Sequence, residues 1–119
     1  MQEVWQANHK ELLEKYPDLV TLVWAQVQKD FSMEALSLVN NNVTTLDAVY
    51  GAIYPEITQY IQSNFNTVMR LLYRIDISEA KVKLQMDLMP DDTAQALATL
   101  IVKREIQKVV LRKQFSSED

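Results

Sequence analysis

The sequence has no cysteine, a single glycine and a single histidine among its 119 residues. Without cysteine there is no disulfide framework and no thiolate chemistry, and one histidine cannot build the usual zinc ligand sets. The single glycine, Gly51, excludes a glycine-rich phosphate loop. With only three prolines it also leaves too few turn residues for a β-sandwich or barrel. We therefore expect an all-α protein that is not an enzyme and that holds no cofactor and no metal.

Long apolar runs are also missing from the sequence. The uninterrupted ones are only a few residues long, whereas a helix needs about 20 apolar residues to span a bilayer. The first residues lack the basic start and apolar run of a signal peptide. These features predict a cytoplasmic protein without a membrane segment, and the length suits a single helical domain over residues 1–119.

Residues 46–75 carry the strongest periodic signal. Apolar side chains recur there at spacings of three and four, on an arc of about 160° of a helical wheel. Pro55 lies on the opposite, polar arc, where a bend would wrap a helix around its core instead of ending it. The pattern predicts one long bent helix of ~45 Å, longer than the ~35 Å diameter of a domain of this size. The core positions expected from it are Ile53, Ile57, Ile61, Val68 and Leu71.

Start and stop signals predict the remaining helices. Pro17 ends one helix and begins the next, because the residue before proline avoids the helical region. Ser32 and Asp92 are expected to cap two later helices, and the residues Thr44-Thr45-Leu46-Asp47 form a capping-box-like start for the long helix. Residues 79–89 also alternate as a strand does, but we favour a helix. The predicted ranges are 3–16, 17–30, 33–39, 79–89 and 93–114. We expect an antiparallel helical bundle of about four main helices around the long bent one.

Charge is distributed unevenly along the chain. No lysine or arginine occurs between Asp30 and Met69, where amides, hydroxyls and five aromatic residues stand instead. Such a composition is typical of the buried centre of protein interfaces, although a long amphipathic helix with Gln and Asn outside would look the same. We therefore expect a non-catalytic protein–protein interaction or structural module, working as a homo-oligomer or with a helical partner. The candidate interaction surface comprises Tyr50, Tyr54, Tyr60, Met69 and Tyr73.

Two other functions stay open from the sequence. Lysines and arginines gather near the end of the last predicted helix, where nucleic acid could bind them, but such residues also complement the helix dipole. We regard nucleic acid as the less favoured partner. This candidate basic patch comprises Lys103, Arg104, Lys108, Arg112 and Lys113. Alternatively, Tyr50, Tyr54 and Tyr60 could line a pocket for a small apolar ligand.

His9 and Asn64 are single polar residues in apolar stripes. His9 has no carboxylate or nucleophile at helical spacing on its own face, so we expect a partly buried side chain and not a general base. Asn64 lies near the centre of the apolar arc of residues 46–75. It is expected either to set the pairing register between helices or to lie where water reaches the end of the bundle.

Overall fold

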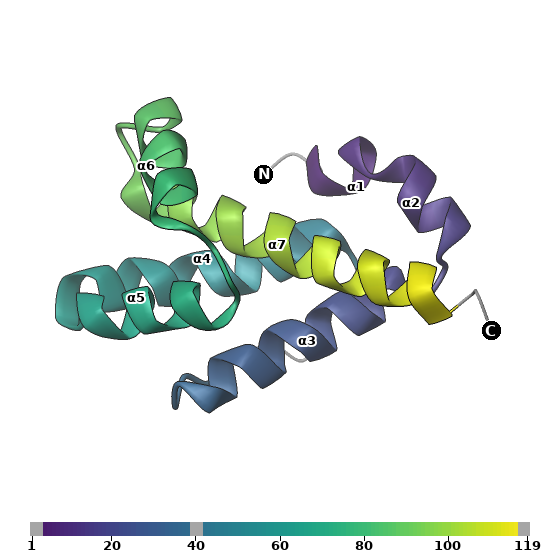
Figure 1. The fold of residues 1–119 in the computed structure, drawn as a ribbon, viewed down its shortest axis with the longest axis horizontal. Helices are drawn as coiled ribbons and strands as arrows, with labels where there is room; N and C mark the ends of the chain where they lie inside the picture. The colour runs from purple at the N-terminus through teal and green to yellow at the C-terminus, as the bar shows by residue number, and fades with distance from the viewer. Residues whose placement is uncertain (1–3, 39–41, 117–119) are drawn as a thin grey trace.

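The computed structural model describes residues 4–38 and 42–116, which form helices and no strand (Figure 1). The prediction of an all-α protein is confirmed. In the described residues the helices are α1 (Val4–Asn8), α2 (Lys10–Lys15), α3 (Leu19–Met33), α4 (Leu46–Ser63), α5 (Phe65–Arg74), α6 (Glu79–Leu88) and α7 (Thr93–Ser116). No helix in this described part of the chain is long and apolar enough to cross a membrane.

Helix α7 lies at the centre of the fold. It runs across the molecule and makes its most extensive contacts with α4, α3 and α6 (Figure 1). Its first half is apolar on almost every side, which is typical of a helix buried all round. The buried residues there are Ala94, Ala96, Leu97, Ala98, Leu100, Ile101 and Val102. The predicted range of 93–114 is thus nearly that observed, but a four-helix antiparallel bundle is not specifically confirmed.

The prediction of one helix over residues 46–75 is wrong. Helix α4 ends at Ser63, and α5 begins two residues later, so that the two helices fold back on each other (Figure 1). Asn64 lies between them with φ −160° and ψ 78°. Its N–H donates to the Tyr60 carbonyl at 2.8 Å, and its side-chain oxygen accepts from the Thr67 N–H at 3.3 Å. One asparagine therefore ends α4 and caps α5.

Within α4 and α5 the expected core is nearly as predicted. Helix α4 continues through Pro55, whose ring is exposed. Four of the five expected core residues are fully buried, and Ile61 is half-buried. The apolar phase runs across Asn64 because both helices turn their apolar sides to the same core. Periodicity therefore located the buried side chains correctly while it missed the break between the helices.

The predicted helix 3–16 is divided at His9, which has φ −120° and ψ 26°. Helix α1 is held by the first turn of α4. The Trp5 and Gln6 N–H groups each donate to a carboxylate oxygen of Asp47 at 2.8 Å, and the Leu46 N–H donates to Oε1 of Gln6 at 2.7 Å. The two helix N-termini thus satisfy each other's free N–H groups. Thr45 caps α4 as expected, since its hydroxyl accepts from the Ala48 N–H at 3.0 Å.

The predicted helix over 33–39 is not present in its described part. Helix α3 instead extends to Met33, and Ser32 donates to the Lys29 carbonyl and caps nothing. Ala35 then takes a left-handed conformation with φ 59°, and the Leu36 N–H donates back to Phe31 at 2.9 Å. This is the Schellman helix ending, which brings the Leu36 side chain into the core. Residues 39–41, including the predicted end of that helix, lie outside the described residues.

Candidate interaction site at helix α6

Helix α6 confirms the prediction of a helix within residues 79–89, and the Ser78 hydroxyl caps it by accepting from the Lys81 N–H at 3.2 Å. Its burial pattern is the reverse of an ordinary surface helix. Gln85 is only 7% exposed, whereas Leu84 and Leu88 are 61% and 67% exposed. A core-facing helix normally buries its leucines and exposes its amides. The outward leucines therefore mark α6 as a candidate docking element.

The side of α6 that faces α7 is semi-polar. Gln85 Nε2 donates to Sδ of Met89 at 3.4 Å, and the Thr99 hydroxyl of α7 lies 3.9 Å from the same sulfur. Of these two contacts, the one from Thr99 joins α7 to the end of α6, and it is weak because sulfur is a poor acceptor. In Figure 1, α6 projects from the body of the fold at one end of α7. Its contact with α7 is as extensive as that of α3, but Gln85 is the one residue of α6 that is buried.

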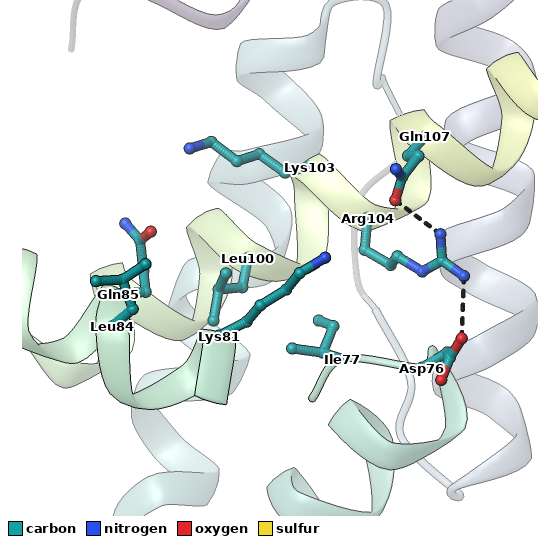
Figure 2. Close-up of a pocket in the computed structure, with 9 residues that line it drawn as sticks. All are labelled: Asp76, Ile77, Lys81, Leu84, Gln85, Leu100, Lys103, Arg104 and Gln107. Carbon is teal, nitrogen blue, oxygen red and sulfur yellow. Dashed lines mark hydrogen bonds and ion pairs between the residues drawn. The ribbon is translucent and has the colours of Figure 1, made fainter. Parts of the chain in front are cut away.

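A hollow of about 420 Å³ lies on the first flank, between α6, α7 and the segment joining α5 to α6 (Figure 2). Its apolar lining comes from Ile77, Leu84 and Leu100. Figure 2 shows Lys81 reaching from α6 toward α7 and Lys103 projecting from α7. The hollow is therefore apolar inside with cationic groups around it.

Arg104 also lines this hollow, but its guanidinium has a structural role. Its Nε donates to the Ile75 carbonyl at 3.0 Å, and its Nη1 donates to Oε1 of Gln107 at 2.7 Å. Its Nη2 lies 3.4 Å from the carboxylate of Asp76, the left-handed residue after α5 (Figure 2). Arg104 thus caps the C-terminus of α5 and ties it to α7.

The opposite flank of α6 forms a second hollow of about 350 Å³ against α5. Its lining is almost wholly apolar and is made by Phe65, Met69, Val82 and Met86. The charged residues beside it alternate in sign along α6, in the order Glu79, Lys83 and Asp87. We call this hollow the α5–α6 groove. Methionines and an aromatic ring on an open apolar surface are typical of adaptable docking sites.

The five residues predicted as one interaction surface differ widely in their exposure to solvent. Tyr50 is only 5% exposed and belongs to the core, and the Tyr54 hydroxyl donates to Asp92 at 2.6 Å. Burial raises the pKa of the Tyr50 hydroxyl, and the hydrogen bond to Asp92 raises the pKa of Tyr54. Tyr60 is half-buried, while Tyr73 is 86% exposed on α5. Of the five, Met69 is the one that lines the α5–α6 groove.

The predicted basic patch is largely neutralised within the fold. Lys108 Nζ lies 2.9 Å from Asp30, and Lys113 Nζ lies 2.6 Å from Asp18. The Lys113 hydrogen bond lowers the pKa of Asp18. Together with Arg104, three of the five residues are engaged by neighbouring carboxylates, whereas Lys103 and Arg112 are exposed. The patch therefore offers a nucleic acid few cations that could contact phosphates without first leaving an acidic partner.

Glu105 is a buried charged residue that the sequence-based prediction missed. It is 0% exposed, faces Asp30 across the α3–α7 contact, and has Lys108 Nζ 3.3 Å from Oε1. Neither carboxylate oxygen accepts a hydrogen bond of good geometry. Burial, followed by the nearby Asp30, raises the pKa of Glu105 from 4.5 to about 8. Burial also opposes ionisation of Asp30, but the nearby polar groups of Glu105, Lys108 and Gln26 outweigh it and lower the pKa of Asp30.

A signal for Glu105 existed in the sequence. It lies four residues after Ile101 and four before Val109, within the buried phase of α7. This carboxyl group is closed off from solvent, since Glu105 is 0% exposed. No group of three potential ligands in these residues could hold a metal ion.

This chain matches no known family. Comparisons with protein-family models, with curated proteins and with solved structures each found no match.

Proposed function

We propose that this chain is a non-catalytic helical interaction module that pairs with a second copy of itself through α6. The observation that carries the proposal is the reversed burial of this helix, with Leu84 and Leu88 outward and Gln85 inward. Apolar surface favours association by roughly 25 cal/mol for each Å² removed from water. Two leucines one helical turn apart can anchor such a contact from one ridge.

A second copy is the partner we propose because α6 offers both projecting leucines and an apolar groove that could receive them. One flank of α6 presents Leu84, and the other flank opens onto the α5–α6 groove. Two identical chains can therefore each supply projecting leucines and each receive them, as a two-fold interface requires.

Charge on α6 also suits self-pairing. The helix carries Glu79, Lys81, Lys83 and Asp87, which sum to zero, whereas the whole chain has a formal net charge of −4. Two copies that meet through α6 therefore avoid the repulsion that contact between acidic faces would bring. A neutral surface with both signs also allows lysine of one copy to pair with a carboxylate of the other.

Light scattering coupled to size-exclusion chromatography tests the proposal between about 1 µM and about 500 µM. We expect a mass approaching twice the 13.8 kDa of one chain as concentration rises. The double substitution Leu84→Glu with Leu88→Glu should leave a monomer with unchanged helix content by circular dichroism. A wild-type chain that stays monomeric across the whole range would refute self-pairing.

The matched control changes two exposed apolar residues elsewhere at the same spacing. Leu111 and Phe115 on α7 are 41% and 70% exposed and are also four residues apart. The double substitution Leu111→Glu with Phe115→Glu adds the same charge, so any general effect of acidity appears in both variants. We expect this control to dimerise like the wild type. If the control variant alone lost the dimer, the interface would be at the end of α7 and not at α6.

A further inference from the structure

A third hollow, of about 490 Å³, lies between α1, α4 and α7 and is separate from the α5–α6 groove. Its walls include the rings of Trp5, His9 and Tyr50, with Thr99 and Lys103 contributed by α7. A volume of this size is within the range of small-molecule sites, which are mostly apolar with a few convergent polar groups. The sequence-based alternative of a ligand pocket named Tyr50, and this is the hollow that Tyr50 lines.

The aromatic wall of this hollow is a stacked column. The Trp5 ring centroid lies 5.7 Å from that of His9 and 5.9 Å from that of Tyr50, with interplanar angles of 13° and 28°. Tyr54 continues the column at 5.9 Å from Tyr50. The backbone of Trp5 is fixed by the Asp47 carboxylate at 2.8 Å. A wall held in this way is formed before any ligand arrives, which lowers the entropic cost of binding.

The polar groups of the hollow favour an anion. None of the described residues that line it is acidic, although the chain has a net charge of −4, and Lys103 stands among them. His9 Nδ1 lies 2.8 Å from the Trp5 carbonyl oxygen, which can only accept. Nδ1 therefore donates this hydrogen bond, which leaves Nε2 of the ring for other contacts. The lining thus combines aromatic surface, one ammonium group and neutral hydrogen-bonding groups.

We infer that this hollow binds a small planar aromatic carboxylate. The ring of the ligand lies against the aromatic wall of Trp5 and Tyr50, and its carboxylate pairs with the Lys103 ammonium group. Aromatic pairs add to the energy of area burial, and a charge-assisted hydrogen bond is about twice as strong as a neutral one. The inference does not depend on self-pairing through α6, so the monomeric Leu84→Glu, Leu88→Glu variant is expected to bind equally well.

Three matched probes test the inference by NMR titration of the ¹⁵N-labelled protein: benzoate, benzamide and cyclohexanecarboxylate. Benzoate should shift the indole N–H signal of Trp5 and the amides of residues 95–103 saturably. The indole N–H of Trp24, which lies on α3, serves as the internal control. Benzamide, without the charge, and cyclohexanecarboxylate, without the flat ring, should each bind about tenfold more weakly. No saturable shift with any probe up to about 10 mM would overturn the inference.

The variant Lys103→Gln tests the contribution of the Lys103 charge to binding separately from that of the aromatic wall. Lys103 is exposed, so its replacement leaves the fold intact. It should weaken benzoate binding about tenfold and leave benzamide binding unchanged. Lys83→Gln, on the outer side of α6, is the matched control and should change neither. Equal benzoate binding by Lys103→Gln and the wild type would refute the assigned carboxylate position, and equal binding of benzoate and cyclohexanecarboxylate would refute the aromatic specificity.

Discussion

Helix α7 has two contrasting neighbours, α3 and α6. The contact with α3 includes a charged cluster of Asp30, Glu105 and Lys108, yet α3 is firmly held because it buries Leu19, Val23, Val27 and Phe31 completely. The contact with α6 contains no ion pair among the described residues. It buries one glutamine of α6 while the leucines of that helix remain outside. Because apolar burial stabilises a contact more than polar groups do, we expect α3 to be more firmly attached to α7 than α6 is.

The two contacts also differ in whether their charged side chains are engaged within the fold or exposed to a partner. Around α3 the ammonium of Lys108 is engaged by Asp30 and lies beside Glu105, so it offers little to a partner. Around α6 the side chains of Lys81 and Lys83 are exposed, together with apolar surface that nothing in the described residues covers. Binding is therefore expected at the weakly attached helix, where a partner can replace water at low cost.

The largest expected effect comes from removing apolar burial on the α3 side. Phe31→Ala should reduce the free energy of unfolding by about 3–5 kcal/mol, because Phe31 is fully buried and leaves a cavity. Leu84→Ala on α6 should change it by less than about 0.5 kcal/mol, since this side chain is 61% exposed. Urea denaturation of both variants at a concentration where the chain is monomeric measures the difference. Similar losses in the two variants would mean that α6 is as firmly packed as α3.

The second test removes the buried carboxylate. Because the pKa of Glu105 is raised from 4.5 to about 8, the folded state keeps a proton that the unfolded chain releases in this range. This contribution makes stability fall as pH rises from 4.5 to 8 and stay low above 8. The full shift corresponds to at most roughly 5 kcal/mol, and the ion pair with Lys108 and the lowered pKa of Asp30 offset part of it.

Glu105→Gln keeps the shape of the protonated side chain without the ability to ionise. We expect it to raise the free energy of unfolding by about 2–4 kcal/mol at pH 9 and to change it little at pH 5. Urea denaturation at pH 5, 7 and 9 provides the profile, with the exposed Glu79→Gln as the control that should follow the wild type. A variant that is less stable than the wild type at pH 9 would show that ionised Glu105 is a net stabilising partner of Lys108.

Much of the helical fold could be predicted from the sequence because capping and periodicity are local. The Thr45 and Asp92 caps are observed where the sequence placed them, the latter accepting from the Gln95 N–H at 3.0 Å. Periodicity could not reveal the break at Asn64, because the apolar residues keep the same helical spacing on both sides of it. The one sign of the break in the sequence was Asn64 itself, a polar residue near the centre of the apolar arc. Ser32 failed as a cap because the Schellman ending placed Leu36 in the core.

The candidate site was harder to predict because it depends on which side of α6 meets α7. The sequence of α6 carries apolar residues on more than one side, so periodicity gives no unique inner face. Met69 was predicted as an interaction residue and lines the α5–α6 groove, whereas Leu84 and Leu88 were not singled out. The ion pairs within the predicted basic patch were hidden from the sequence for a related reason. The acidic partners of Lys108 and Lys113 lie on or next to α3, about 80 to 95 positions away in sequence, where no local pattern can reveal them.

The smallest effect is expected from making the α6 contact resemble the α3 contact. Gln85→Leu replaces a buried amide, bonded only to the Met89 sulfur, by an apolar side chain of similar size. It should raise the free energy of unfolding by about 1 kcal/mol. Hydrogen exchange should slow at the amides of α6 and remain unchanged at α3, because only the attachment of α6 to α7 has been strengthened. Since Gln85 faces inward, self-pairing through Leu84 and Leu88 should persist in this variant. A loss of stability would instead mean that the weak amide–sulfur bond positions α6, and that this helix is held by polar geometry where α3 is held by its apolar core.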